Sequence, residues 1–338
     1  MLKTLKLSLP FSSYNADLNR ITAPIDTEFK DFKKAYKNSM RTNVFLINRI
    51  SGYMTSRYGK MFRPKLVLLS AKLFGPINEQ TIASAVLIEL LHIATLMHDD
   101  VVDRAEHRRG IPSIHSIWKN KTAVLMGDFL FSRALINLVG LRNFDSLDVL
   151  SMAAERMSKG ELLQLEKNRS NGLDEETYFR MISDKTASLF SAASEMGALT
   201  TTDSVDKRNA LSLYGEHLGI AFQLKDDLFD YVGKKANTGK PVGRDVKENL
   251  ITLPVIHSLG KDSKRSARKI IKNLRNKNGK SDFQMAVNYV KEHGGLEYTE
   301  QKLNFHSQKA IDSLSELEDS DSKDALIKFV RFNIDRTR

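Results

Sequence analysis

Apolar residues recur at helical spacing through most of this chain. A clear example is the set Leu211, Tyr214, Leu218, Phe222 and Phe229, which would share one face of a long helix. No segment has a convincing alternation of apolar and polar residues, and no strands alternate with helices. The pattern therefore predicts an all-α protein, a large single-domain helical bundle around one core.

Helix-breaking residues are few and unevenly distributed. The chain has 7 prolines and none between Pro112 and Pro241, an interval that predicts successive helices with turns at 142–143, 171–172 and 201–203. Segment 231–249 differs, because three glycines, one proline and five Lys or Arg residues predict a basic loop there. No shift in composition marks a second domain. We expect an N-terminal extension over 1–23 and one domain over 24–338.

Composition narrows the class of protein. The 338 residues include no cysteine, which excludes disulfides and thiolate metal sites and favours a cytoplasmic location. The net charge of +11 suits an anionic partner, but no nucleic-acid recognition motif is present, so we expect no nucleic acid. The most apolar stretch, Ala83 to Met97, is interrupted by Ser84, Glu89 and His92 and is too short to span a bilayer. We therefore expect a soluble protein.

Two apolar helices are each predicted to end in an acidic cluster of the form DDxxD. In the first, Asp99 and Asp103 lie four residues apart and share a helix face, while Asp100 points aside. In the second, Asp226 and Asp230 have the same relationship. Like charges at this spacing repel, and carboxylates near a helix C-terminus oppose the helix dipole. A divalent cation relieves both penalties, so two facing clusters predict a pocket for Mg²⁺ and a polyphosphate.

Basic residues near these clusters could contact a diphosphate directly. Arg108 and Arg109 follow the first cluster, where a helix C-cap is the alternative interpretation. Lys60 and Arg63 come where a helix should start with Pro64 in its first turn, a plausible anion site or a simple turn.

Further polar residues fall on predicted apolar helix faces. His92 lies two turns before the first aspartate, although a lone histidine there is more often a core residue. Lys185 and Thr186 adjoin an otherwise uncharged helical stretch, and Gln223 lies one turn before the second acidic cluster. These residues converge on one predicted pocket.

The motifs together resemble those of the trans-polyprenyl diphosphate synthases. They are GKMFRP (59–64), HDDVVDRAEHRRG (98–110), MGDFL (126–130), GELLQLE (160–166), KTA (185–187), FQLKDDLFDY (222–231) and GKPVG (239–243). In this order they cover most of the chain, from about Pro24 to Pro254. The resemblance implies an all-α prenyltransferase fold with a central cavity, usually a homodimer. Two positions depart from the family pattern, Tyr58 before the first basic motif and Leu250 before TLP.

The resemblance also implies roles for individual residues. It makes three aspartates the ligands of Mg²⁺, with three ions per active site: Asp99, Asp103 and Asp226. It makes three cations further contacts to the allylic diphosphate: Arg108, Lys185 and Lys240. It assigns four residues to the isopentenyl diphosphate site: Lys60, Arg63, His92 and Arg109. It places the oxygens of Thr186 and Gln223 near a developing carbocation.

The implied reaction ionises the allylic C–O bond, after which the isopentenyl double bond attacks the cation and a proton is lost. No protein nucleophile is required, and cationic groups stabilise the leaving diphosphate. Water has to be excluded, so segment 231–249 is expected to act as a lid, with Lys240 closing on phosphate.

Small residues precede the first acidic cluster and bear on product length. Ala94 and Thr95 lie where a bulky side chain would block a chain growing away from the metal ions, about 6–8 Å below them. This favours a long-chain product such as hexaprenyl or octaprenyl diphosphate, although small residues can also simply allow close helix packing. Three alternatives stay open: a farnesyl or geranylgeranyl diphosphate synthase, a terpene cyclase, and a subunit of a heteromeric synthase. A lipid-like product also suggests peripheral proximity to a membrane.

Overall fold

The computed structural model describes residues 17–56, 59–108, 111–170, 174–232, 251–260 and 280–336. Its elements are, in chain order, η1 (Ala23–Ile25), α2 (Asp26–Ser39), α3 (Phe45–Thr55), α4 (Phe62–Lys72), α5 (Glu79–Val102), β1 (His107–Arg108), β2 (Ile111–Pro112), α6 (Ile114–Gly140), α7 (Phe144–Ser170), α8 (Glu175–Ile182), η2 (Ser183–Ala187), α9 (Ser188–Leu199), α10 (Val205–Val232), α13 (Leu253–Gly260), α15 (Lys280–Glu292), α16 (Gly295–Asp312) and α17 (Asp321–Asp335). The all-α prediction is confirmed. Among the described residues the exception is the hairpin β1–β2, whose strands have two residues each and are too short to leave an alternating pattern in the sequence.

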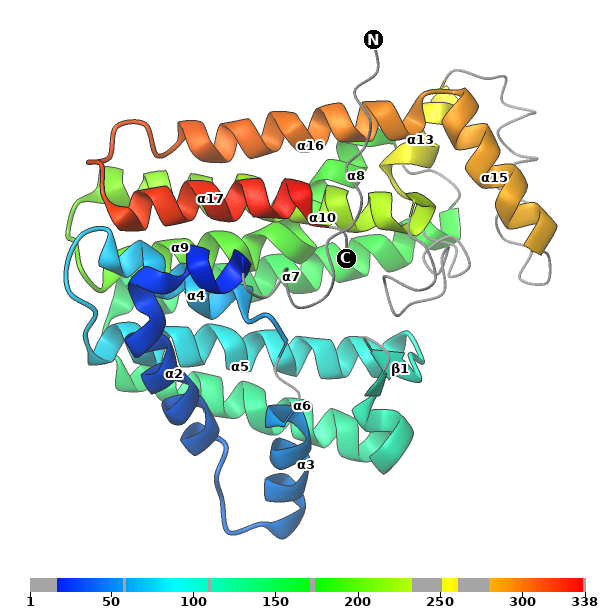
Figure 1. The fold of residues 1–338 in the computed structure, drawn as a ribbon. Helices are drawn as coiled ribbons and strands as arrows, with labels where there is room; N and C mark the ends of the chain where they lie inside the picture. The colour runs from blue at the N-terminus through cyan, green and yellow to red at the C-terminus, as the bar shows by residue number, and fades with distance from the viewer. Residues whose placement is uncertain are drawn as a thin grey trace.

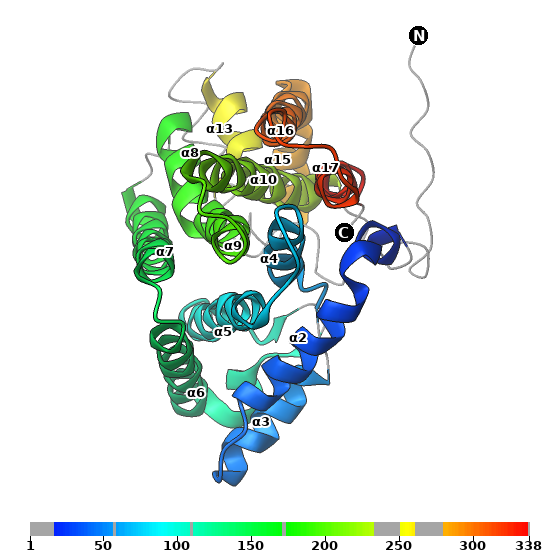
Figure 2. The ribbon, with the colours of Figure 1, turned by 90° about the vertical axis from the view of Figure 1, so that its left-hand side faces the viewer.

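Helix α9 forms the centre of the bundle. It packs against α4, α5, α7 and α10 (Figures 1 and 2), and every residue from Ser188 to Ser194 is buried. A helix that is buried on all sides needs small side chains for close approach, which the sequence SLFSAASEMGAL supplies. Around it, α5 and α6 lie side by side on one flank, while α10, α16 and α17 form the other.

Local signals explain where the site-bearing helices begin. Asn78 caps α5 by accepting from the backbone of Thr81, whose hydroxyl reaches back to the Asn78 backbone, so two end groups are satisfied together. Helix α4 begins at Phe62 and holds Pro64 in its first turn, as expected. The regularly spaced apolar residues between 211 and 229 all fall within the single helix α10.

Two helices are longer and more apolar than the sequence interpretation allowed. By length and composition alone, α5 (24 residues) and α6 (27 residues) could each cross a membrane. The length argument based on Ala83 to Met97 was therefore wrong, because α5 extends beyond that stretch at both ends. In the most apolar 18-residue window of α5, 61% is buried inside the protein, as in an ordinary core helix. In the corresponding window of α6 only 33% is buried.

Candidate active site

The first acidic cluster divides between two environments. Helix α5 ends at Val102, and the amide of Asp103 donates to the carbonyl of Asp99 at 2.8 Å, so these two residues keep the predicted i, i+4 relationship. Asp100 is only 7% exposed. The β1 residue Arg108 points Nε and Nη2 at Asp100 Oδ1, each at 2.8 Å. Arg108 therefore neutralises Asp100, and it lies on the hairpin rather than in a helix cap.

Asp99 is half-buried beside both acidic and basic side chains. Burial, followed by the nearby carboxylate of Glu161, raises the pKa of Asp99 from its ordinary 3.8 to about 6, and Asp103 adds to the increase. The positive charges of Lys185 and Arg108 act in the opposite direction. Helices α5 and α7 and the η2 turn thus bring acidic and basic groups together around Asp99.

The η2 turn presents Lys185 to helix α7. Lys185 Nζ is 2.5 Å from Glu161 Oε2 and donates to Gln164 Oε1 at 3.0 Å. Backbones approach closely here, because a Cβ on Gly160 would lie 2.4 Å from the Lys185 amide nitrogen. On the other side of the turn, a Cβ on Gly219 would lie 2.5 Å from Ala187 Cα. Two glycines therefore allow the turn to fit between α7 and α10.

A chain of hydrogen bonds fixes the orientation of Thr186. Tyr178 OH donates to Asp227 Oδ2 at 2.5 Å, and Gln223 Nε2 donates to Asp227 Oδ1 at 2.9 Å. Gln223 Oε1 consequently accepts the Thr186 hydroxyl proton at 2.9 Å. With its proton committed in this way, Thr186 has oxygen lone pairs left to offer a neighbouring cation.

The second acidic cluster is contacted by residues at and just after the end of α17. Arg336 Nη1 is 2.8 Å from Asp226 Oδ1, and its guanidinium stacks 3.9 Å from the Phe222 ring centroid. Lys225 Nζ donates to the Ile334 carbonyl at 2.5 Å. Asp227, in contrast, is 2% exposed and faces the core. In this cluster Asp226 is therefore paired with Arg336, whereas Asp227 belongs to the hydrogen-bond network of Tyr178.

The expected isopentenyl residues Arg63 and His92 do lie together. Arg63 Nη1 is 3.0 Å from His92 Nε2, which joins the start of α4 to the middle of α5. The Arg63 guanidinium also lies 4.4 Å from the centroid of the Phe190 ring. Lys60 lies beside this helix start, with Nζ 5.8 Å from the Phe62 ring. A histidine and cations at a helix N-terminus suit an anion.

The two proposed chain-length residues have different surroundings. Ala94 is 1% exposed and belongs to the main hydrophobic core, whereas Thr95 is half-buried and donates its hydroxyl to the His92 carbonyl at 2.9 Å. Both lie one to two turns before Asp99 on α5.

Several predicted residues lie outside the described part of the chain. They are Tyr58, Arg109, Lys240, Leu250 and the expected lid after Val232. Sequence reasoning in turn assigned no role to five residues that the structure places at the site: Glu161, Gln164, Tyr178, Asp227 and Arg336. A signal existed for Glu161 and Gln164 in the motif GELLQLE, and for Asp227 in the motif FQLKDDLFDY.

The donors around Asp99 fit a hard divalent cation. Among the described residues, no three carboxylate or imidazole groups converge into a ready-made metal site. Mg²⁺ usually takes one or two protein carboxylates together with substrate phosphates, and Asp99, Asp103 and Glu161 offer only oxygen ligands. The pKa of Asp99 is raised first by burial and then by the carboxylates of Glu161 and Asp103, and a bound cation would favour the charged form of Asp99.

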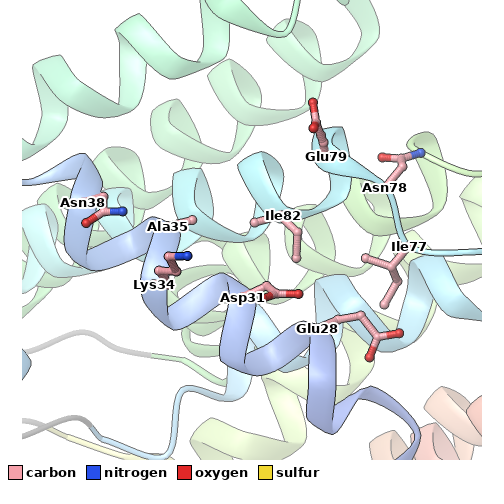
Figure 3. A pocket seen from close by; sticks show the side chains of 9 residues that line it. All are labelled: Glu28, Asp31, Lys34, Ala35, Asn38, Ile77, Asn78, Glu79 and Ile82. Carbon is pink, nitrogen blue, oxygen red and sulfur yellow. The ribbon is translucent and has the colours of Figure 1, made fainter.

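A surface pocket elsewhere is distinct from this site. It measures about 550 Å³ and lies between α2 and the beginning of α5 (Figure 3). Its lining residue Glu79 starts the helix that carries Asp99 twenty residues later, which corresponds to about 30 Å along the axis.

Comparison with known proteins defines the class. The polyprenyl synthetase family model matches residues 45–290. Octaprenyl diphosphate synthase of Escherichia coli is 34% identical over 321 residues, which cover 95% of this chain and 98% of that protein. The all-trans-nonaprenyl-diphosphate synthase (geranyl-diphosphate specific) of Rhodobacter capsulatus is 33% identical, covering 94% and 97%.

Solved structures give the same result. The polyprenyl synthase of Caulobacter crescentus, crystallised with calcium and isoprenyl diphosphate, has a TM-score of 0.89 at 32% identity, covering 95% of this chain and 98% of that one. The decaprenyl diphosphate synthase of Rhodobacter capsulatus also has a TM-score of 0.89 at 32% identity, covering 95% and 99%. The chain belongs to the polyprenyl synthetase family. It is an enzyme, a chain-elongating trans-prenyltransferase.

Proposed function

We propose that this enzyme condenses isopentenyl diphosphate with an allylic diphosphate of the farnesyl or geranylgeranyl type, giving a long-chain all-trans polyprenyl diphosphate. The observation that carries the proposal is the electrostatic coupling of Asp99 on α5 to Glu161 on α7 and Lys185 on η2. A surplus of carboxylate beside fixed cations suits a metal-bound diphosphate better than a bare anion.

Each group has a role in this reaction. Bound Mg²⁺, held through Asp99, Asp103 and Asp226, would neutralise the diphosphate as it leaves. Lys185 and Arg108 add direct positive charge on the same side. Thr186, whose proton is committed to Gln223, offers its lone pairs to the allylic cation.

The second substrate has a separate anchor in this proposal. Arg63 and His92 would hold the isopentenyl diphosphate, with its double bond toward the allylic cation, so that the two substrates meet between α4 and α5. Proton loss to the departing diphosphate completes the step without a protein nucleophile. An isopentenyl site of this kind favours chain elongation over terpene cyclisation.

Product length is assigned from Ala94. Its small side chain is buried behind the acidic cluster on α5, so a growing chain would meet no aromatic floor there. The similarity to the octaprenyl and nonaprenyl diphosphate synthases of two bacteria supports the same assignment.

Assembly as a homodimer is part of the proposal. Helix α6 exposes a series of large apolar side chains: Ile117, Val124, Leu125, Phe131, Leu135, Ile136 and Val139. A second copy packed on this face would remove them from water. Light scattering should give twice the chain mass, whereas Leu135→Glu with Ile136→Glu should give a monomer. We also propose a cytoplasmic location, with transient membrane contact when the product leaves.

The deciding assay uses the purified full chain with farnesyl diphosphate and labelled isopentenyl diphosphate, with and without Mg²⁺. Products are dephosphorylated and sized by chromatography. We expect Mg²⁺-dependent incorporation and products of six or more isoprene units. Products of three or four units would overturn the long-chain assignment. The absence of Mg²⁺-dependent incorporation would overturn the proposed function.

A further inference from the structure

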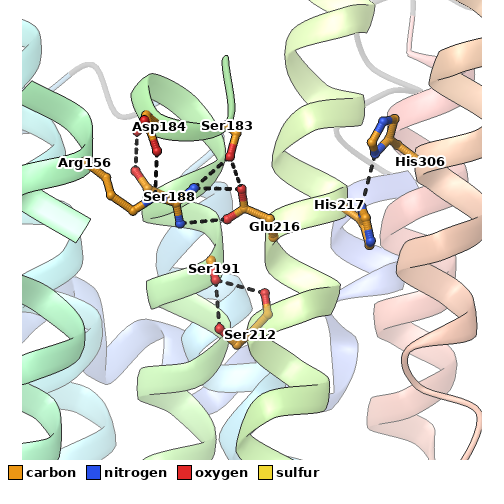
Figure 4. A network of polar contacts seen from close by, with 9 residues as sticks. All are labelled: Arg156, Ser183, Asp184, Ser188, Ser191, Ser212, Glu216, His217 and His306. Carbon is orange, nitrogen blue, oxygen red and sulfur yellow. Dashed lines mark hydrogen bonds and ion pairs between the residues drawn. The ribbon is translucent and has the colours of Figure 1, made fainter. Parts of the chain in front are cut away.

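A charged network outside the proposed substrate contacts holds one side of the η2 turn. Arg156 on α7 donates from Nε to Asp184 Oδ1 at 2.8 Å and from Nη2 to Ser183 Oγ at 2.7 Å. The same guanidinium pairs with Glu216 on α10, at 3.1 Å from Nη1 to Oε2 and 2.8 Å from Nη2 to Oε1. Ser183 also donates to Glu216. Figure 4 shows how these contacts join α7, η2 and α10.

The network lies next to the residues that the reaction would use. Ser183 and Asp184 immediately precede Lys185 and Thr186 in the same five-residue π-helical turn. A π-helical turn is rare and often marks a functional site, and it is held by its surroundings rather than by its own propensity. Fixing one half of so short a turn also fixes the other half.

Helix α7 contacts the turn at three positions spaced by four residues. Arg156 binds the start of the turn, Gly160 allows the Lys185 backbone to approach, and Gln164 accepts from Lys185 Nζ. Residues at this spacing share one helix face. The turn is therefore aligned along a single stripe of α7, with Arg156 at one end and Gln164 at the other.

We propose that Arg156 is a positioning residue for the prenyl transfer, acting through the η2 turn to hold Lys185 and Thr186 in place. The inference rests on the proposed function of those two residues. One guanidinium here balances two carboxylates, whose side chains are only 22% and 20% exposed. Without it, Asp184 and Glu216 would repel each other and push the turn away from α10.

The variants Arg156→Met, Arg156→Lys and Glu216→Gln test the inference. Methionine removes the charge, lysine keeps it but cannot bridge three partners, and glutamine weakens one partner. The matched control is Lys159→Met on the same helix, which removes a cation from an exposed pair with Glu155 at 2.8 Å. The first measurement is hydrogen exchange at the backbone amides of residues 183–188. The second is kcat and KM for each substrate, at a temperature below the unfolding transition of every variant.

Arg156→Met should accelerate exchange at 183–188 and raise the KM for the allylic diphosphate about tenfold, because misplaced contacts lose binding and orientation. The KM for isopentenyl diphosphate and the Lys159→Met control should change less than about twofold. In a Lys185→Ala background, Arg156→Met should add little to the allylic KM, because its route of action is already removed. If Arg156→Met raised the allylic KM in that background as much as it does in the wild-type chain, action through Lys185 would be contradicted.

A purely structural role would lower the melting temperature and leave the allylic KM unchanged, and this result would overturn the inference. The exchange measurement needs no turnover. If the wild-type chain incorporated no isopentenyl units, the proposed function would fail, whereas unchanged exchange in Arg156→Met would refute the anchor itself. Should Arg156→Met not fold, Arg156→Lys and Glu216→Gln carry the same test, with an expected KM increase of about threefold.

Discussion

Arg336 Nη1 lies 2.8 Å from Asp226 Oδ1, so the residue that caps the C-terminus of α17 pairs with the second acidic cluster. Arg336 is 4% exposed and also donates from Nη2 to the Phe222 carbonyl at 2.7 Å. Its guanidinium places a positive charge on one of the three proposed metal ligands. A divalent cation arriving at Asp226 would therefore compete with Arg336 for the same oxygen.

Replacing Arg336 tests this competition. We expect Arg336→Gln to lower the Mg²⁺ concentration for half-maximal activity by about threefold, because Asp226 loses its resident cation. The variant should also lose roughly 1–3 kcal/mol of unfolding free energy, since a buried hydrogen bond and a ring contact disappear. Magnesium titrations of initial rate and thermal melts measure the two effects. Arg331→Gln, at an exposed position of α17, is the control; a higher Mg²⁺ requirement in Arg336→Gln would contradict competition.

Asp99 and Asp100 are adjacent, but their substitution should have different effects. Asp99→Asn should reduce the rate by about 10²–10³-fold, because the carboxylate is proposed to hold the Mg²⁺ that would neutralise the leaving diphosphate. Asp100→Asn should mainly release Arg108 and cost about 1–3 kcal/mol of stability, with a smaller loss of rate. Initial rates and melting temperatures of both variants decide the matter. Equal loss of rate with an unchanged melting temperature in Asp100→Asn would assign Asp100 a direct role.

The sequence predicted relationships that follow from helical spacing. Asp99 and Asp103 keep their i, i+4 relationship because Asp103 caps the helix that carries Asp99, and the helix class followed from apolar periodicity. The sequence did not predict which aspartates of the two clusters would be paired with an arginine. Asp100 meets Arg108 only because a two-residue hairpin reverses the chain, and Asp226 meets Arg336 only because α17 returns across the bundle.

The surroundings of Lys185 show the same limit. An inward-facing lysine could be predicted from the uncharged stretch that follows it. That it sits on a π-helical turn, pressed against Gly160, depends on how α7 packs against that turn. Tertiary packing decides such geometry, and no local pattern in one sequence encodes it.

Product length should respond to the size of residue 94. Ala94→Phe adds an aromatic ring at a position that is 1% exposed and near the acidic cluster, so the products should become shorter. Overpacking should also cost about 1–3 kcal/mol of stability. Thr95→Val keeps the side-chain size and removes only the hydroxyl that bonds His92, so its products should stay long. Chromatography of the products measures both; unchanged length in an active Ala94→Phe enzyme would exclude a growing chain at this position.

Lys119 has a backbone conformation that favours glycine. Its φ of 72° and ψ of 161° interrupt α6 near the helix start. Lys119→Gly should raise the unfolding free energy by about 1 kcal/mol, because strain in the folded chain is relieved. Lys121→Gly, two residues later in regular helix, should instead lower it by about 1 kcal/mol. Denaturant titrations compare the two variants, and destabilisation by both would show that Lys119 is not strained.

The imidazole of His306 should make the fold sensitive to acid. Burial, followed by the charges of His217 and Lys302, lowers the pKa of His306 from 6.5 to about 4. Its ring stacks near Phe179, and its Nδ1 lies 3.1 Å from His217 Nδ1 (Figure 4). The pKa of His217 is also lowered, by burial and by Lys309, against the pull of Glu216. Burial and the lysines of α16 thus oppose protonation of the pair.

Acid should therefore favour the unfolded chain, whose imidazole binds a proton near pH 6.5 while the folded one resists until about pH 4. The stability that the folded protein retains by keeping His306 neutral is complete above pH 6.5 and is lost as the pH falls toward 4. His306→Asn should make the melting temperature depend less steeply on pH across this interval. At the acidic end of the interval, the free energy of unfolding that the wild-type protein loses through His306 is on the order of 2 kcal/mol. His107→Asn, on the exposed β1 strand, should leave the dependence unchanged. An equally steep pH dependence in His306→Asn would assign the acid sensitivity to other groups.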